Sequence, residues 1–232
     1  MPQQSENPSG QQGEENFVCL LEDNVRRLGE KPALLWDGGA LSWAELDQRA
    51  SGFAHFLAAK GAGPGDRIAT LIPNHWSFAV ALLGILKLGA TAATLHPTLK
   101  PEELAEVMAD LQPRLLVENV TSDKGSWKTT RFTSAAAVIV YTSGSTARPK
   151  GAVFGHDAFT FANRSWGGPV MGITPDDIVL GALPFAHNYG MNSSLLAPLL
   201  YGATVVIVEH YSPESVLEII GKRRVTVFPG VA

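Results

Sequence analysis

A polar stretch rich in small residues follows a run of β-branched residues near the middle of the sequence. Residues 138–140 (Val-Ile-Val) predict a buried strand, because Val and Ile suit a pleat that is covered on both faces. The stretch after it offers hydroxyl donors, the positive charge of Lys150, and glycines that let backbone N–H groups approach a ligand closely. These features suit the phosphates of a triphosphate. The predicted phosphate-binding residues are Thr142, Ser143, Gly144, Ser145, Thr146, Lys150 and Gly151.

The spacing of these residues differs from that of the Walker A loop, G-x-x-x-x-G-K followed by Ser or Thr. Counted from Gly144, Pro149 stands at the second glycine position, and Gly151 follows the lysine. An ordinary P-loop NTPase is therefore excluded. A flexible Ser/Gly connector is the alternative, but it explains neither the buried strand before the stretch nor the Pro-Lys-Gly at its end.

Residues 142–151 resemble the signature of the adenylate-forming (AMP-binding) superfamily: acyl-CoA synthetases, luciferases and peptide-synthetase adenylation domains. Its pattern reads Ser/Thr, Ser, Gly, Ser/Thr, Thr, Gly, any residue, Pro, Lys, Gly, and Ala147 is the one departure. If this position needs a positive φ, Ala adds strain of roughly 1–2 kcal/mol. Individually weaker matches extend the resemblance over residues 17–232, and they lie at residues 41–46, 65–68, 73–74, 88–90, 183–187 and 225–228.

The resemblance is greatest to the N-terminal half of a fatty acyl-CoA synthetase. It implies an ATP-dependent carboxylate–CoA ligase that forms an acyl-adenylate and then an acyl-CoA, from a medium- or long-chain fatty acid. ATP, Mg²⁺ and coenzyme A are the cofactors and co-substrates that it implies. Thr142 would also reach the metal, and His187, Asn188 and Tyr189 would belong to the acyl pocket. No catalytic residue is assigned within this portion.

Two histidines have structural alternatives. His187 is either the residue at the mouth of the acyl pocket or a hydrogen-bonded loop histidine that packs on the next helix. His156 and Asp157 would make a metal or acid–base pair, but a helix N-cap by Asp157 is the simpler interpretation. The remaining histidines lack the spacing of zinc ligands.

The composition excludes several classes of function. A net charge of −4, from 18 basic and 22 acidic residues, gives no reason to expect nucleic acid as a partner. The single cysteine, Cys19, excludes an internal disulfide. The longest apolar run, residues 78–88, is too short to cross a bilayer, and residues 1–16 are polar and unlike a signal peptide. These features predict a soluble cytoplasmic protein.

Strand and helix patterns alternate along the chain. This order predicts an α/β fold with mostly parallel sheets flanked by helices, as in the first part of the large N-terminal domain of acyl-CoA synthetases. The predicted division is a disordered tail (1–16), a first α/β subdomain (17–120) and a second (134–232), with a polar boundary at 121–133. Helices are expected at 17–28, 42–60, 76–88, 102–111, 157–166, 192–200 and 212–221, and strands at 33–36, 40–41, 66–72, 91–95, 114–117, 138–140, 178–183, 204–208 and 225–228. A glycine turn is expected to join the strands 33–36 and 40–41 into a hairpin, Ser42 and Glu45 to form a capping box, and Asn74 to cap the helix at 76–88.

Motifs that the resemblance implies for adenosine and ribose, and the domain with the catalytic lysine, do not occur in the sequence. The 232-residue chain alone is therefore expected to be inactive. Two other readings stay open: a stand-alone nucleotide-binding module, and an interaction protein completed by a partner chain. The apolar residues 225–228 predict an unpaired sheet edge and self-association through it.

Overall fold

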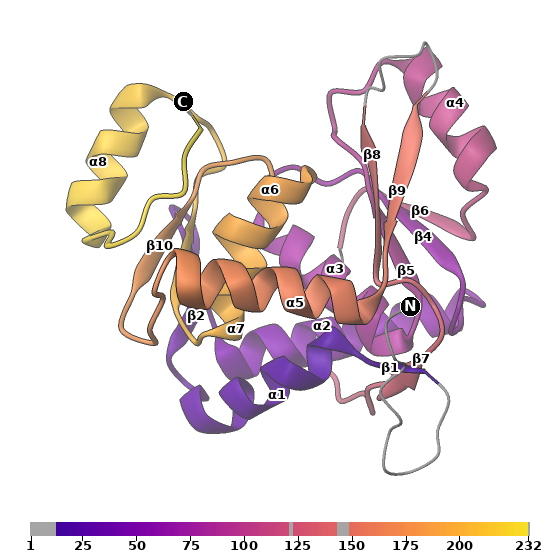
Figure 1. Cartoon of the computed structure of the whole chain (residues 1–232), viewed down its shortest axis with the longest axis horizontal. Helices are drawn as coiled ribbons and strands as arrows, with labels where there is room; N and C mark the ends of the chain where they lie inside the picture. Colours follow the sequence, from indigo (N-terminus) through magenta and orange to yellow (C-terminus); the bar gives the residue numbers. More distant parts are fainter. Residues whose placement is uncertain (1–12, 121–122, 143–148, 232) are drawn as a thin grey trace.

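A computed structural model describes residues 13–120, 123–142 and 149–231. The larger of the sheets in this part has the strand order β6-β4-β5-β8-β9 (Figure 1). Strands β6, β4, β5 and β8 are parallel, and β9 returns antiparallel to β8. The bounds of the strands are β4 (Arg67–Thr70), β5 (Thr91–Thr94), β6 (Leu115–Val117), β8 (Val138–Thr142) and β9 (Lys150–Phe154).

A second sheet has the order β10-β11-β2-β3, in which β10, β11 and β2 are parallel. Strand β3 forms the expected hairpin with β2. The short strands β1 and β7 pair with each other. The mostly parallel α/β fold is thus confirmed. The bounds are β1 (Glu14–Glu15), β2 (Pro32–Trp36), β3 (Gly39–Ser42), β7 (Phe132–Thr133), β10 (Ile178–Gly181) and β11 (Thr204–Ile207).

The helices follow the expected pattern closely. Ser42 and Glu45 form the predicted capping box of α2. Every residue of α3 after Trp76 is buried, as its nearly continuous apolar sequence predicts. The bounds are α1 (Phe17–Leu28), α2 (Trp43–Ala59), α3 (Trp76–Leu88), α4 (Pro101–Leu111), α5 (His156–Ser165), α6 (Asn188–Met191), α7 (Ala197–Leu200) and α8 (Pro213–Arg223).

Two π-helical turns adjoin the helices, and two of the predicted helices are longer than expected. The turn η1 (Trp166–Val170) continues α5, and η2 (Asn192–Leu196) joins α6 to α7. The predicted helix at 192–200 therefore begins earlier, at Asn188. Such turns widen a helix locally and are frequent near functional sites.

One apolar core joins the two larger sheets. It contains Leu34 of β2 and Val205 of β11, together with Ile68 of β4 and Ala92 of β5. Each larger sheet takes strands from both sides of residues 121–133. The sheets themselves therefore do not follow the expected division into residues 17–120 and 134–232.

Residues 14–16, part of the predicted disordered tail, belong to the fold: Glu14 and Glu15 form β1, and Asn16 precedes α1. The side chain of Asn16 is fully buried, and its Oδ1 caps α1 by accepting from the Val18 N–H. Its Nδ2 donates to the carbonyl oxygens of Leu86 and Thr130 at 2.6 and 2.9 Å. These hydrogen bonds offset the cost of burying the Asn16 amide. The polar composition of residues 1–16 does not reveal such partners. Residues 1–12 lie outside the described part.

Two predicted caps are wrong. His75, and not Asn74, caps α3, because Nδ1 of His75 accepts from the Ser77 N–H while Asn74 bonds elsewhere. At α5 the cap position is Gly155, and the Asp157 N–H donates to the carboxylate of Glu14 at 2.9 Å. A Cβ on Gly155 would lie 2.8 Å from a Glu14 carboxylate oxygen. The absence of a side chain at residue 155 therefore leaves space for the carboxylate of Glu14.

Residues 225–228 do not form a full strand, contrary to expectation. Only Val227 makes a bridge, parallel to Val179 of β10. The Leu180 N–H donates to the Val227 carbonyl at 2.9 Å, and the Thr226 N–H donates to that of Ile178 at 2.8 Å. This segment therefore pairs with the edge of β10. No helix among the described residues is both long and apolar enough to cross a membrane.

Candidate functional site

The predicted phosphate-binding residues lie at the end of the β8–β9 hairpin. Thr142, the last residue of β8, pairs with Lys150, the first residue of β9. Lys150 is exposed, so its ammonium group is available to a ligand. The predicted residues Ser143, Gly144, Ser145 and Thr146 lie outside the described part of the chain. The structure thus places the two flanks of the predicted loop opposite each other.

Gly151 has a role that the sequence argument did not find. It lies opposite Tyr141 in the register of the hairpin. A Cβ at this position would lie 3.0 Å from Cγ2 of Ile139 and 3.1 Å from Cζ of Tyr141. Both contacts are closer than ordinary van der Waals packing, so the glycine makes room for side chains of the neighbouring strand.

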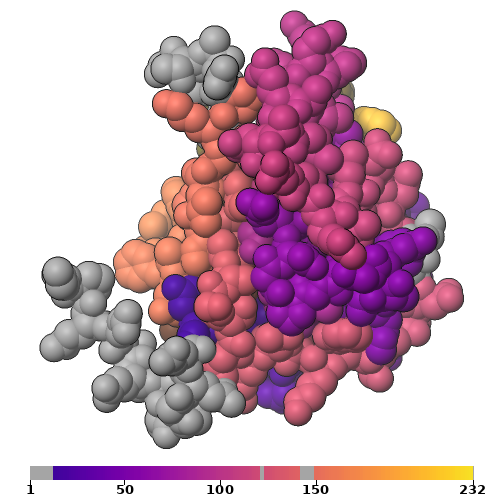
Figure 2. Space-filling model, turned by 90° about the vertical axis from the view of Figure 1, so that its right-hand side faces the viewer, coloured from indigo at the N-terminus to yellow at the C-terminus, as the bar shows by residue number. Residues whose placement is uncertain are grey.

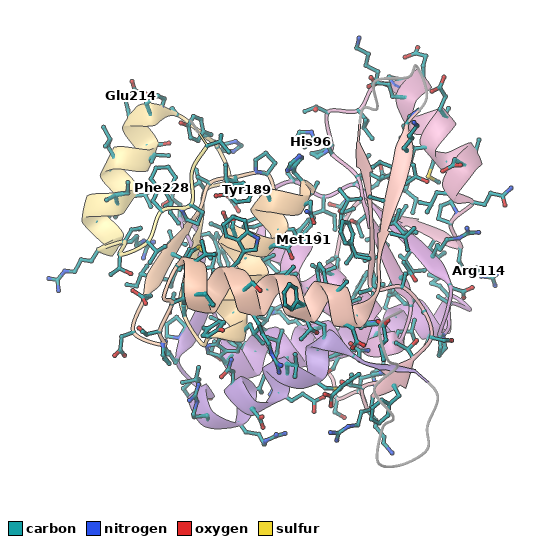
Figure 3. The ribbon with its side chains drawn as sticks, in the orientation of Figure 1. His96, Arg114, Tyr189, Met191, Glu214 and Phe228 are labelled. Carbon is teal, nitrogen blue, oxygen red and sulfur yellow. The ribbon has the colours of Figure 1, made fainter. Side chains whose placement is uncertain are left out.

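The three predicted acyl-pocket residues lie at the start of α6. His187 is exposed and is the N-cap residue of this helix, with Nδ1 accepting from the Tyr189 N–H at 3.3 Å. Asn188 and Tyr189 are half-buried. Tyr189 and Met191 lie in the middle of the molecule, between α8 and the β8–β9 hairpin (Figure 3).

Aromatic and apolar groups surround Tyr189. Its ring centre lies 5.3 Å from that of Trp166, and its hydroxyl donates to the Gly230 carbonyl at 3.3 Å. Met191 is fully buried. Gly190 is required here, because a Cβ on it would lie 2.2 Å from the Pro184 carbonyl oxygen. The start of α6 is therefore pressed against the segment that precedes it.

Asn74 holds that preceding segment in place. Its Nδ2 donates to the Leu183 carbonyl at 2.8 Å and to that of Gly181 at 3.4 Å, and its Oδ1 accepts from the Phe185 N–H at 2.7 Å. The Thr94 hydroxyl donates to the carbonyl of Ala186 at 3.2 Å. Sequence reasoning missed both roles, because an Asn after a strand also suits a helix cap. Together they fix the residues directly before His187.

A cavity of about 210 Å³ lies beside these contacts. It is lined from the carboxyl ends of β4 and β5 and from the segments after β10 and β11, which is where parallel sheets commonly hold ligands. Nε2 of His75 lies 3.5 Å from a carboxylate oxygen of Glu209 at its border. The lining residues include Asn74, His96, Pro97, Ala186, Glu209 and Tyr211.

His156 does not form a metal or acid–base site. Its side chain is fully buried, and Nδ1 accepts from the Phe17 N–H at 3.1 Å. Burial lowers the pKa of His156 to about 4, so the ring is neutral. Within the described ranges, no group of three His, Cys, Asp or Glu residues is placed to hold a metal ion.

Comparisons with known proteins fit this arrangement. The model of the family "AMP-binding enzyme" matches residues 21–135 and 133–232, and the chain belongs to that family. A feruloyl-CoA synthase of Amycolatopsis is 29% identical over 237 residues, covering 89% of this chain and 47% of the relative. A dimodular nonribosomal peptide synthase of Bacillus subtilis is 30% identical over 254 residues, covering 90% of this chain and 10% of the synthase.

The fold also matches solved structures. The anthranilate CoA ligase AuaEII, in complex with anthranoyl-AMP, superposes with a TM-score of 0.87 at 20% identity. The match covers 96% of this chain and 51% of the ligase. The chain spans about half the length of the CoA ligases that it matches. The comparisons therefore show the family and the N-terminal fold of adenylate-forming enzymes, among which are both CoA ligases and peptide-synthase modules.

Proposed function

We propose that this chain is the N-terminal portion of an ATP-dependent carboxylate–CoA ligase. The observation that carries the proposal is the β8–β9 hairpin, which places Thr142 and Lys150 opposite each other in a chain of the AMP-binding enzyme family. In the proposed reaction a carboxylate attacks the α-phosphate of ATP and releases pyrophosphate. The acyl group then passes to the thiol of coenzyme A, and AMP leaves.

The residues of the hairpin would hold the β- and γ-phosphates. Attack by a carboxylate on a triphosphate brings negative charges together, so positive charge and N–H or O–H donors must offset the repulsion. Lys150 would supply the charge, and Thr142, Ser143, Gly144, Ser145, Thr146 and Gly151 complete the proposed set. Thr142 would help to hold a Mg²⁺ ion, which would supply further positive charge at the phosphates.

For the acid we propose a medium- or long-chain fatty acid, held near His187, Asn188 and Tyr189. The aromatic and apolar residues of this region support this proposal, because Trp166 packs near Tyr189, and Met191 of the same helix is buried. An adenylation module for amino acids is the second candidate, and the 30% identity to the peptide synthase favours it.

Binding of Mg·ATP to the 232-residue chain, measured by isothermal titration calorimetry, tests the phosphate site. Replacing Lys150 by Ala should weaken binding roughly 10- to 150-fold, because a charge-assisted hydrogen bond contributes about 1.5–3 kcal/mol. The control Lys222→Ala removes an equally exposed charge from α8 and should leave the affinity unchanged. Equal affinities of the wild type and Lys150→Ala would contradict the proposed site.

The acid is tested by the fluorescence of Trp166, in a titration with C6 to C16 fatty acids and with amino acids. A fatty acid should change the emission of the wild type and not that of Trp166→Phe. A response to amino acids alone would favour the adenylation module.

A further inference from the structure

A hydrogen bond joins the strand that leads into the phosphate-binding residues to a helix packed on the sheet. The hydroxyl of Tyr141 on β8 donates to a carboxylate oxygen of Asp110, near the end of α4, at 2.6 Å. This is a short contact for a hydroxyl and an acid, and such charge-assisted bonds are stronger than neutral ones. Tyr141 also packs on the apolar cluster between α4 and the sheet, which contains Val107, Leu111 and Ile139.

The position of the Tyr141 ring depends on the space beside Gly151. A Cβ on Gly151 would lie 3.1 Å from Cζ of Tyr141 and 3.3 Å from its hydroxyl oxygen. A side chain at residue 151 would therefore require the tyrosine ring, or the backbone of β9, to shift by a few tenths of an ångström. The glycine, the tyrosine and the aspartate therefore form one contact across β9, β8 and α4.

The tyrosine hydroxyl is held as a hydrogen-bond donor. In this bond the hydroxyl of Tyr141 is the donor and the carboxylate of Asp110 is the acceptor. In Figure 2, α4 (magenta) and β9 (orange) lie side by side at the top of this face.

We propose that Tyr141, Asp110 and Gly151 form a latch that fixes the ends of β8 and β9 on α4. The inference rests on the proposed function, because its consequence is the placement of Thr142 and Lys150. These residues pair with each other directly beyond the pair of Tyr141 and Gly151. Tyr141 and Asp110 are thus positioning residues for the phosphate site. A small displacement of a positioned charge is costly, since binding groups act only within a narrow range of geometry.

Two single variants and their combination test the latch in the 232-residue chain. Tyr141→Phe removes only the hydroxyl, and Asp110→Asn removes only the charge of the acceptor. Tyr201→Phe is the matched control, because its hydroxyl donates to the Arg164 carbonyl at 3.0 Å and neither residue belongs to β8, β9 or α4. Hydrogen exchange of the amides in β8 and β9 reports the anchoring, and calorimetric titration with Mg·ATP reports the consequence.

We expect Tyr141→Phe and Asp110→Asn each to speed exchange in β9 and to weaken ATP binding about 3- to 10-fold. The double variant should lose no more ATP affinity than the single variant that binds ATP more weakly, because each single substitution already removes the same hydrogen bond. Tyr201→Phe should change neither quantity.

Faster exchange with an unchanged ATP affinity would overturn the proposal, because the bond would then be merely structural. Unchanged exchange in β9 would overturn it as well. If the wild type and Lys150→Ala both fail to bind ATP, the proposed function itself fails, and the role of the latch in it fails too. Weaker binding by Lys150→Ala together with normal binding by Tyr141→Phe would reject the latch alone.

Discussion

At the scale of single residues, His156 shows how burial sets the charge of a side chain. Nδ1 accepts from the Phe17 N–H, and Nε2 has no hydrogen-bond partner among the described residues. A proton added to Nε2 would therefore be buried without an acceptor. Desolvation is the main cause of the lowered pKa of about 4, and the charge of Asp157 offsets it in part.

This pKa predicts how the free energy of unfolding depends on pH. In the unfolded chain the histidine has a pKa of about 6.5, so it binds a proton there at pH values where folded His156 stays neutral. The favourable contribution of neutral His156 to the free energy of unfolding is therefore fully present above pH 6.5, and it is lost as the pH falls toward 4. The loss is on the order of 3 kcal/mol.

Urea unfolding of the wild type and of His156→Asn, measured between pH 7.5 and 4.5, tests this prediction. The Asn side chain keeps an acceptor for the Phe17 N–H but does not titrate, so the variant should lose less stability at low pH. His210→Asn replaces an exposed histidine and should keep the slope of the wild type. Equal slopes for the wild type and His156→Asn would show that the ring is not kept neutral.

At the scale of elements, the contact between α2 and α3 depends on one glycine. A Cβ on Gly84 of α3 would lie 2.7 Å from the Ala50 carbonyl oxygen and 2.9 Å from Cδ1 of Phe53, both on α2. The two helices approach this closely only because Gly84 has no side chain. A glycine inside a helix otherwise destabilises it relative to alanine.

We predict opposite effects for the same substitution at two helical glycines. Gly84→Ala should lower the free energy of unfolding by about 1–3 kcal/mol, because the helices must move apart. Gly221→Ala in α8, where a Cβ would contact nothing within 4 Å, should raise it by up to about 1 kcal/mol. Urea unfolding at pH 7.5 measures both. Stabilisation by Gly84→Ala would mean that α2 and α3 are less closely packed than described.

The sequence predicts elements well where a local pattern decides them. The capping box at Ser42 and the buried helix α3 follow from residue types within a few positions. The caps at α3 and α5 were wrong, because their choice depends on partners more than 100 positions away: Asn74 bonds Leu183, and Glu14 reaches Asp157. Similarly, residue types indicate the phosphate-binding stretch, but only the structure shows that Gly151 leaves space for the side chains of Ile139 and Tyr141 on the neighbouring strand.

At the scale of the whole molecule, the proposed acyl and phosphate regions depend on both larger sheets. Thr142 and Lys150 belong to the sheet of β4 and β5, whereas His187 lies after β10, a strand of the other larger sheet. Asn74 and Thr94, which follow or end strands of the first sheet, bond the segment just before His187. The relative placement of the two regions is therefore fixed by hydrogen bonds between the sheets and by the shared core.

The last prediction concerns the edge of the larger sheet. Because residues 225–228 pair with β10, we place the predicted self-association on β9, which among the described residues pairs with β8 alone. Val153 of β9 is 63% exposed, and an exposed apolar edge with unpaired N–H and C=O groups favours pairing between chains.

We expect the mass from analytical ultracentrifugation to rise above 24.7 kDa across a tenfold increase in concentration. Val153→Lys should restore the monomer, because a charged side chain blocks edge-to-edge pairing. Val170→Lys changes an equally exposed valine (63%) of η1 that lies on no strand, and it should associate like the wild type. A wild type that stays monomeric, or equal effects of the two lysines, would show that β9 is not the associating edge.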